Sequence, residues 1–373
     1  MSDLEVSEIT TAILDIPIRR PHRFATLSIN AQSTVLVRIG TGSGLAGIGE
    51  GVVPGGPWWG GESVETIKEL IDRYLAPVIT GQDPRQVRPL AARMQRALSG
   101  APFARAAVEM ALWDLAGKAA GVPLYQLLGG AFRDRLPVTW ALGAEPAAAV
   151  IAEAGDLLDR GLHRSFKLKM GAEDPPADVE RVAAIARSLS GRADLSVDLN
   201  GSWDEATAAR WLPRLAAAGI GVAEQPVPGW NTAALARLAR RGDIPLMADE
   251  SLRTVHDAAA LAAAHAADIF AVKLAKSGGI ASVHEIGAVA AAHGVPCYGG
   301  TTIETSLGTA ASAHTFASMG ALTAGCELFG PLLLADDIAA TPVRYASGHL
   351  CLPEGPGLGI TLDEDKVAKY ARG

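Results

Sequence analysis

The feature that most constrains this 373-residue chain is a regular alternation of short β-rich runs with Ala-rich helical runs, which continues to about residue 330. Alternation of strand and helix predicts βα units around a parallel sheet. A barrel of eight such units takes about 250 residues, or about 30 for each unit. We read eight candidate strands here: LPVTWAL, HRSFKLKM, DLSVDLN, IGVAEQP, IPLMA, DIFAVKL, GVPCYGG and LTAGCELFG.

Charged residues stand at the ends of five successive candidate strands. Lys167 and Lys169 in FKLKMG are two residues apart, so both side chains point to the same face of their strand. The next strand ends carry Asp198, Glu224, Asp249 and Lys273. Counted from Lys169, the intervals are 29, 26, 25 and 24 residues (198 − 169, 224 − 198, 249 − 224, 273 − 249), close to one βα unit each. Because the carboxyl ends of barrel strands converge on one mouth, these residues are predicted to form one site.

The carboxylates Asp198, Glu224 and Asp249 offer only oxygen ligands, and no histidine stands at those strand ends. Such a set suits Mg²⁺ or Mn²⁺ and not zinc or copper. A metal-free ring of carboxylates paired with lysines is the alternative, although so many like charges at one mouth would be destabilising without a divalent ion. A partly desolvated lysine among other cations can reach a pKa suited to acid/base work. The set predicts proton transfer at the carbon α to a metal-bound carboxylate, with the metal stabilising an enediolate.

The first 130 residues have a different pattern. Three strand-like runs between residues 7 and 53 and three helical runs up to about residue 129 predict a small antiparallel sheet with helices packed on it. In the third helical run, we expect Glu109 and Asp114 to serve core packing and local hydrogen bonding. Trp58 and Trp59 lie in the Gly/Pro-rich loop PGGPWWGG, which is either a lid over an apolar substrate or a loop packed on its own domain.

Composition excludes several classes of protein. The net charge of −7 argues against a general nucleic-acid or anionic-membrane surface. No run approaches the roughly 18 apolar residues that a membrane helix needs. The three cysteines are odd in number and have no metal-ligand spacing, so we expect free thiols, as in a reducing cytoplasm. The beginning of the chain shows no secretory pattern, and a cytoplasmic protein is expected.

Several motifs together make the sequence recognisable. They are RPHRFA, VEMALWDLAGKAAGVPL, FKLKMG, SVDLN, EQP, MADES, the lysine before AKSGG, YGGTTIETSLGTAASAH, GCELFGPLLLADDI and PGLGITLDE. On these motifs the chain resembles the muconate lactonizing enzymes (muconate cycloisomerases) of the enolase superfamily, in the mandelate racemase/muconate lactonizing enzyme group. The resemblance covers nearly the whole chain.

The resemblance implies an α/β fold, a modified TIM barrel of the (β/α)7β type under an N-terminal α+β capping domain. We expect the cap at residues 1–130, with lid loops near 19–32 and 54–62. The barrel is then at 131–340, and residues 341–373 form a C-terminal segment that packs back on the cap. A homo-oligomer is implied as well, for which an octamer is one form.

The same resemblance assigns roles to individual residues. Asp198, Glu224 and Asp249 are the metal ligands for Mn²⁺ or Mg²⁺. Lys169 is the acid/base lysine and Lys167 its support. Lys273 is the lysine on the opposite face, and Glu327 on the last strand hydrogen-bonds the metal-bound carboxylate. For substrate binding we expect Asn200, Trp58, Trp59, Thr301 and Glu304.

The implied reaction is cycloisomerization of cis,cis-muconate, a small dicarboxylate, to muconolactone through a metal-stabilised enolate, as in catechol degradation by the β-ketoadipate pathway. The alternatives are o-succinylbenzoate synthase, N-acylamino acid racemase and chloromuconate cycloisomerase, which share the lysines and the carboxylates. The Asp-x-Asp associated with dipeptide epimerases is absent, since Cys326, Glu327 and Leu328 occupy that place. A binding protein that has lost the chemistry is disfavoured because the complete charged set is present.

Overall fold

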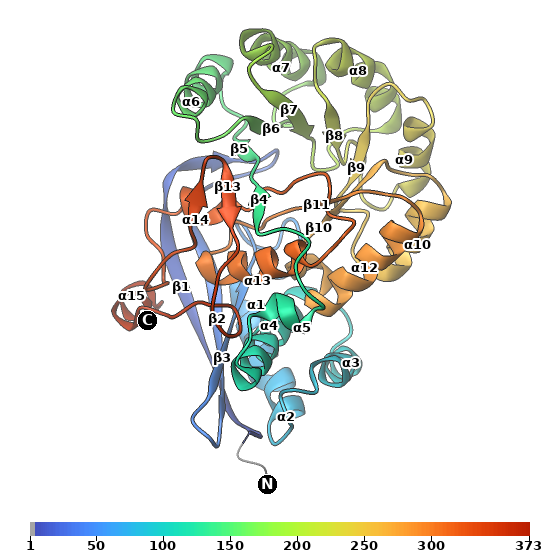
Figure 1. Cartoon of the computed structure of the whole chain (residues 1–373). Coiled ribbons are helices and arrows are strands. Elements are labelled where there is room, and N and C mark those ends of the chain that lie inside the picture. The colour runs from blue at the N-terminus through green and yellow to red at the C-terminus, as the bar shows by residue number, and fades with distance from the viewer. Residues whose placement is uncertain (1–3) are drawn as a thin grey trace.

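The computed structural model describes residues 4–373, and its N-terminal part is built on one antiparallel sheet. The strands are β1 (Val6–Arg23), β2 (Ser28–Thr41) and β3 (Ala46–Val52), in the order β1-β2-β3. The predicted three-stranded sheet is therefore present. It lies beside the barrel and forms one side of the molecule (Figure 1). Residues 1–3 of the expected cap lie outside the described residues.

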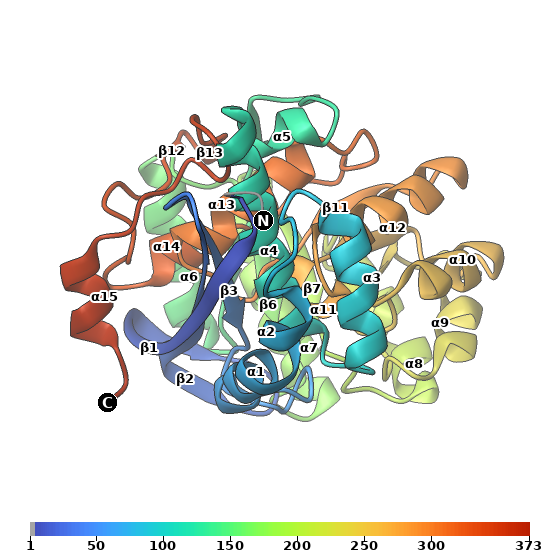
Figure 2. The same cartoon turned by 90° about the horizontal axis from the view of Figure 1, so that it is seen from below.

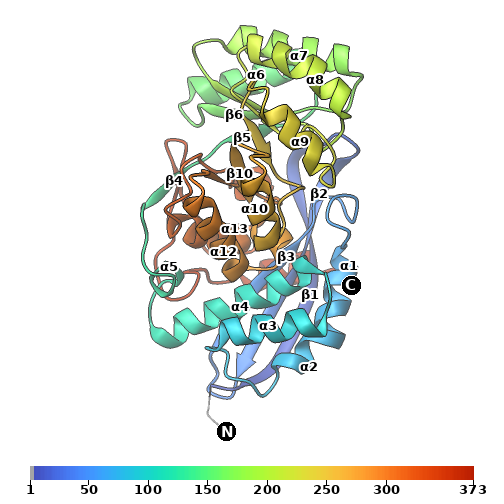
Figure 3. The same ribbon diagram turned by 90° about the vertical axis from the view of Figure 1, so that its right-hand side faces the viewer.

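The first hairpin is longer than the sequence pattern indicates. Where a lid loop was expected near residues 19–32, β1 and β2 continue to pair, with His22 opposite Ile29. The amide of Phe24 donates to the carbonyl of Leu27 at 2.8 Å and closes the turn. The pairing register shifts between Pro17 and His22, a stretch in which prolines remove ladder donors. The expected loop is thus the tip of a hairpin, which reaches up beside the barrel (Figure 3).

Six helical segments complete the cap, and α4 is the one that joins it to the barrel. Seen from below, α4 runs between the sheet and the barrel helices (Figure 2). It is apolar on nearly all sides, as expected for a helix buried between two layers. Gly47 and Gly49 of β3 let it approach closely, since a Cβ at Gly49 would lie 2.1 Å from the carbonyl oxygen of Ala107. The segments are α1 (Val64–Leu70), the π-helical turn η1 (Ile71–Leu75), α2 (Ala76–Ile79), α3 (Val87–Ala97), α4 (Pro102–Ala120) and α5 (Leu124–Leu127).

Seven parallel strands form the curled sheet of the barrel, with hydrogen-bonded order β11-β10-β9-β8-β7-β6-β5. Helices surround it on the outside (Figure 1). The strands are β5 (Trp140–Leu142), β6 (Ser165–Lys169), β7 (Asp194–Asp198), β8 (Val222–Glu224), β9 (Leu246–Ala248), β10 (Ile269–Val272) and β11 (Cys297–Gly299). The helices are α6 (Ala147–Asp159), α7 (Pro175–Leu189), α8 (Glu205–Ala217), α9 (Thr232–Ala239), α10 (Val255–Ala263), α11 (Leu274–Ser277), α12 (Ile280–Ala292) and α13 (Ser306–Ala317).

A single residue closes the ring where an eighth strand was predicted. Cys326 forms parallel bridges to both Val138 and Gly299, at the two edges of the seven-stranded sheet. The predicted strand at 322–330 is thus reduced to one bridging position. The fold is a modified TIM barrel of the (β/α)7β type with an N-terminal capping domain, as predicted.

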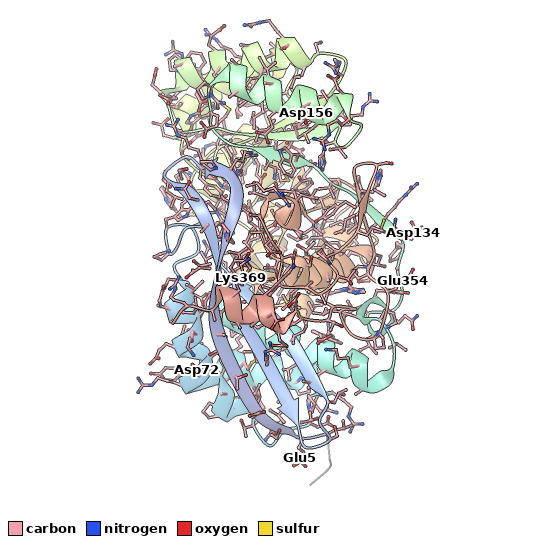
Figure 4. The ribbon with its side chains drawn as sticks, turned by 90° about the vertical axis from the view of Figure 1, so that its left-hand side faces the viewer. Glu5, Asp72, Asp134, Asp156, Glu354 and Lys369 are labelled. Carbon is pink, nitrogen blue, oxygen red and sulfur yellow. The ribbon has the colours of Figure 1, made fainter. Side chains whose placement is uncertain are left out.

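The C-terminal part of the chain contacts both halves of the molecule. β13 (His349–Cys351) pairs with β4 (Arg135–Pro137), whereas α15 (Glu364–Tyr370) lies on β1. Figure 4 shows α15, marked by Lys369, across the strands of the cap. Arg372 pairs with Asp15 at 2.7 Å. The remaining short elements are β12 (Tyr345–Ala346) and α14 (Gly330–Leu333). The exact domain limits at 130 and 340 stay a prediction.

Carboxylates of the cap bind the N-terminal ends of barrel helices. Glu109 of α4 accepts from the amides of Ile280 at 2.5 Å and Ala281 at 3.1 Å, at the start of α12. Glu50 of β3 accepts from the amide of Thr305 at 3.1 Å, at the start of α13. Those first amides have no partner within their helix, and a nearby acid suits the helix dipole. Glu109 is buried in the core as expected, but these two hydrogen bonds join it to residues 171 and 172 positions away, whereas Asp114, also buried, has the expected local partner in Lys118 at 2.6 Å.

Two further expectations from composition concern membrane-spanning helices and the cysteines, and both can be checked in residues 4–373. None of the described helices has the length and apolarity needed to span a membrane. Cys297, Cys326 and Cys351 are free thiols, as predicted.

Candidate active site

A pocket lies where the carboxyl ends of the barrel strands meet the cap. The cap contributes the hairpin tip with His22 and Phe24, and also the loop at 54–62. The barrel contributes the ends of several strands, because parallel strands bring their carboxyl ends to one mouth. Of the predicted site residues, the pocket is lined by Lys169, Asn200, Lys273, Thr301, Glu327, Trp58 and Trp59.

Lys169 is the lysine of FKLKMG that faces this pocket. It ends β6 and stands in register with Asp198 at the end of β7. Its ammonium group donates to Asp198 Oδ2, and Asn200 Oδ1 lies 3.5 Å away. The ring of Phe24 from the cap lies 5.4 Å from Lys169 Nζ. Lys169 therefore has both a carboxylate partner and open space beside it, which a proton donor needs.

Lys167 lies beneath the pocket and is fully buried. Its Nζ is 2.5 Å from Glu224 Oε2 and 2.6 Å from Glu327 Oε2, and it lies 4.5 Å from the ring centre of Tyr298. Burial acts to lower the pKa of Lys167, but the two glutamates outweigh it and hold that pKa well above its ordinary value. Lys167 is thus a fixed cation that holds two carboxylates in place.

Lys273 faces the pocket from the other side. Its Nζ is 2.7 Å from Asp249 Oδ2 and 4.4 Å from the ring centre of Trp59. Burial acts to lower the pKa of Lys273, but Asp249 and neighbouring glutamates raise it above its ordinary value. A group held protonated in this way supplies positive charge to the pocket.

Lys276 was not singled out from the sequence, although it stands in the quoted AKSGG. It is buried, and its Nζ donates to Asp249 Oδ1 at 2.5 Å, to the carbonyl of Asp249 at 2.7 Å and to that of Ala271 at 2.8 Å. Gln225 also holds this strand end, since its Oε1 accepts from the amide of Asp249 at 2.9 Å. Asp249 is therefore fixed from two sides.

The carboxylates Asp198, Glu224 and Asp249 occupy neighbouring strand ends, and Asp198 is in register with Glu224. Neither oxygen of Glu224 makes a hydrogen bond, although Oε2 lies within ion-pair distance of Lys167. Burial, together with the charges of Asp198 and Asp249, raises the pKa of Glu224 to about 8 against the lowering effect of Lys167. Glu224 has no hydrogen-bond donor and shares the cation Lys167 with Glu327, so negative charge remains in excess beside Asp198 and Asp249.

This donor set fits a divalent cation such as Mg²⁺ or Mn²⁺, because it consists of hard oxygens with unmet charge. Within residues 4–373, however, no three histidine, cysteine or acidic side chains are grouped closely enough to form a metal cluster. The reason is that the lysines draw the carboxylates apart: Asp198 turns to Lys169, and Asp249 turns to Lys273 and Lys276.

Glu304 is the predicted substrate-binding residue that the pocket does not include. Its carboxylate accepts from the hydroxyl of Thr301, and from the amide and hydroxyl of Thr302 at 3.0 and 2.7 Å. It therefore shapes the loop that carries Thr301. The sequence reasoning did not single out seven other lining residues: His22, Phe24, Pro54, Ala141, Thr302, Ile303 and Phe329. The first two lie in RPHRFA and Phe329 in ELFGP, so the quoted motifs already contained the signal.

Three residues around the mouth of the barrel have unusual backbone φ angles. Asn200, Gln225 and Ile303 follow strand ends around the pocket and have φ of 45°, 36° and 63°. Residues other than glycine rarely adopt this left-handed region, and such outliers gather at functional sites.

Two family models together match most of the chain. Residues 149–366 match "Enolase C-terminal domain-like", and residues 8–129 match "Mandelate racemase / muconate lactonizing enzyme, N-terminal domain". The chain belongs to the mandelate racemase/muconate lactonizing enzyme family. It is therefore an enzyme of the enolase superfamily, whose members use a divalent metal.

Individual relatives agree with this membership of the family. Muconate cycloisomerase 1 of Rhodococcus opacus is 48% identical over 372 residues, which is 100% of both chains. The crystal structure of 2-chloromuconate cycloisomerase from Rhodococcus opacus 1CP superposes with a TM-score of 0.97 at 48% identity, covering 99% of this chain and 100% of the other. Muconate lactonizing enzyme from Pseudomonas fluorescens, complexed with muconolactone, gives a TM-score of 0.97 at 42% identity with the same coverage.

Proposed function

We propose that this enzyme converts cis,cis-muconate to muconolactone. The observation that carries the proposal is the placing of Lys169 and Lys273 on one pocket, each beside a carboxylate at a strand end. A planar dicarboxylate between them would meet a proton donor and a fixed positive charge. The names of the relatives support this substrate, since the similar enzymes are called muconate and chloromuconate cycloisomerases.

The reaction is an isomerization, so all atoms of the substrate remain in the product. An oxygen of one carboxylate adds to the diene, and the electron pair moves to the other carboxylate as an enolate. Lys169 Nζ then gives its proton to the carbon α of that enolate, and the new C–H bond completes the lactone. Lys273 Nζ offsets negative charge from the opposite side.

The remaining charged residues prepare the site for this step. Lys167 keeps Glu224 and Glu327 in fixed positions, and Glu327 lies at the pocket wall, where its carboxyl group would donate to the substrate carboxylate when it carries a proton. Asp198, Glu224 and Asp249 would hold Mn²⁺ or Mg²⁺. When bound, this ion supplies the positive charge that favours the enolate.

A second substrate class follows from the relatives. The similar solved enzyme from Rhodococcus opacus is named for 2-chloromuconate, and another relative is a chloromuconate cycloisomerase 43% identical to this chain. A chlorinated muconate is therefore the alternative substrate. The resemblance implies the same lysines in muconate and chloromuconate cycloisomerases. The shape of the pocket wall therefore has to determine which of the two substrates is used.

An ultraviolet assay tests the proposal directly. The purified enzyme with Mn²⁺ is given cis,cis-muconate, 2-chloromuconate or an N-acylamino acid, and loss of diene absorbance or racemization is followed. We expect turnover of cis,cis-muconate. No turnover of either muconate, together with racemization of the N-acylamino acid, would refute the proposal.

We further propose that the enzyme works in the cytoplasm as a homo-oligomer. The free thiols of Cys297, Cys326 and Cys351 support a reducing compartment. Mass measurement in solution by light scattering tests the assembly.

A further inference from the structure

The two adjacent tryptophans of the loop at 54–62 make different contacts. Trp58 stays within the cap, because its indole Nε1 donates to the carbonyl of Pro54 at 2.7 Å and its ring lies 5.4 Å from that of Phe24. Trp59 crosses to the barrel, where its Nε1 donates to Glu250 Oε1 at 2.9 Å. Only the second tryptophan links the two domains by its indole nitrogen.

Glu250 is placed to receive this link. It directly follows Asp249, at the end of β9, and its Oε1 also accepts from Asn200 Nδ2 at 3.0 Å. The other oxygen, Oε2, is buried and has no hydrogen-bond partner among the described residues. Two donors on one carboxylate oxygen fix the side chain.

The ring of Trp59 also forms one wall around Lys273. Lys273 Nζ lies 4.4 Å from the Trp59 ring centre, with Asp249 Oδ2 at 2.7 Å. An ammonium group over an indole face is attracted to it, and the attraction grows when water is excluded. The ring cannot easily turn away, because the ring of Phe103 meets it edge-on at 6.1 Å.

We infer that Trp59 is a positioning residue, which Glu250 holds against the barrel so that its ring sets the place of Lys273. The role assigned to Lys273 rests on the proposed function, whereas the link between Trp59 and Glu250 does not. The loop at 54–62 would then close the pocket and orient a charged group at the same time. Trp58, by contrast, only shapes the wall of the pocket.

Four single variants and two double variants test this inference. Trp59→Phe keeps a ring but removes the indole N–H, and Glu250→Ala removes the acceptor. Each should lower kcat for cis,cis-muconate by about tenfold, as expected when a buried hydrogen bond is lost and its remaining partner is left unsatisfied. Glu250→Gln keeps an acceptor oxygen and should retain most of the activity. Trp140→Phe is the matched control, since it removes the hydrogen bond of another indole N–H to a glutamate, Glu153 at 2.7 Å, and Trp140 does not line the pocket.

The double variants separate a shared link from general damage. Because Trp59 and Glu250 act through one hydrogen bond, Trp59→Phe in the Glu250→Ala background should cost little more than either change alone. The losses of activity caused by Trp140→Phe and Glu250→Ala should multiply, because no hydrogen bond joins these two residues. Affinity for Mn²⁺, measured by calorimetry, should stay at the wild-type value in all variants, which shows that Asp249 is intact.

A second readout does not depend on the reaction. Hydrogen exchange of the segment 54–62, followed by mass spectrometry, should speed up in Trp59→Phe and Glu250→Ala and stay unchanged in Glu250→Gln. Unchanged exchange in Glu250→Ala, or losses of Trp59→Phe and Glu250→Ala that multiply, would overturn the inference. If the wild type failed to convert muconate, the proposed function would fail, while exchange would still decide whether the link exists.

Discussion

Replacing Glu109 by glutamine should change how the stability of this enzyme depends on pH. Glu109 is fully buried between cap and barrel, where it accepts from the first two amides of α12. Burial raises the pKa of Glu109 from 4.5 to about 7, although the amides of α12 and the charge of Arg105 act to lower it. Glutamine has the same shape and cannot ionise.

The linkage between proton binding and folding gives the direction and the size of the change in stability with pH. The folded pKa of Glu109 is above the unfolded one, so ionisation favours the unfolded chain between these two values. The resulting loss of stability is absent below pH 4.5, grows up to about pH 7 and is constant above it. At about 1.4 kcal/mol for each pH unit, the free energy of unfolding of the wild type should fall by about 2 to 3 kcal/mol relative to the variant between about pH 5 and 8.

Urea unfolding followed by tryptophan fluorescence measures this difference. The variant also loses one acceptor for the amides of α12, which shifts its stability by an amount that does not change with pH. The informative quantity is therefore the slope with pH. Glu69→Gln, at an exposed salt bridge with Arg73, is the control and should show no such slope. A wild type that gains stability over Glu109→Gln as pH rises would refute the reasoning, because α12 would then favour the ionised carboxylate.

Three further outcomes concern the active site. Lys169→Ala should lower kcat for muconate by about a hundredfold or more, while calorimetry shows unchanged Mn²⁺ affinity; retained activity would mean that another lysine moves the proton. Lys276→Met removes one of the two buried lysines that hold Asp249 and should weaken Mn²⁺ binding by about tenfold to a hundredfold, as measured by calorimetry. Chelation of divalent ions should abolish turnover, and Mn²⁺ or Mg²⁺ should restore it; full activity after exhaustive chelation would argue for a metal-free site.

The fold was predictable from the sequence because its signals are regular. Each βα unit repeats an apolar strand and a helix, and the charged residue at each strand end marks the mouth. The eighth strand was overestimated, because a run such as LTAGCELFG looks the same whether one residue or several join a sheet. Only Cys326 reaches both edges, and that depends on how far the ring has already curled.

The charged residues of the active site could be predicted from the sequence, whereas the residues that hold them in place could not. Lys169 and Asp198 follow from strand ends that fall in register, which spacing reveals. Glu304 could not be placed, because whether its carboxylate faces the pocket or its own loop depends on side-chain rotation. Glu250 gave no separate signal beside Asp249, since its partner Trp59 is 191 residues away and belongs to the other domain.

The packing of α15 on β1 has a consequence for how the molecule is made. Arg372, the penultimate residue, pairs with Asp15 at 2.7 Å and with Glu65 at 2.5 Å, and Ala371 bridges Leu14. The first and last parts of the chain thus complete the same surface. This contact can form only after α15 has been synthesised, so β1 lacks it while the barrel segments are being made.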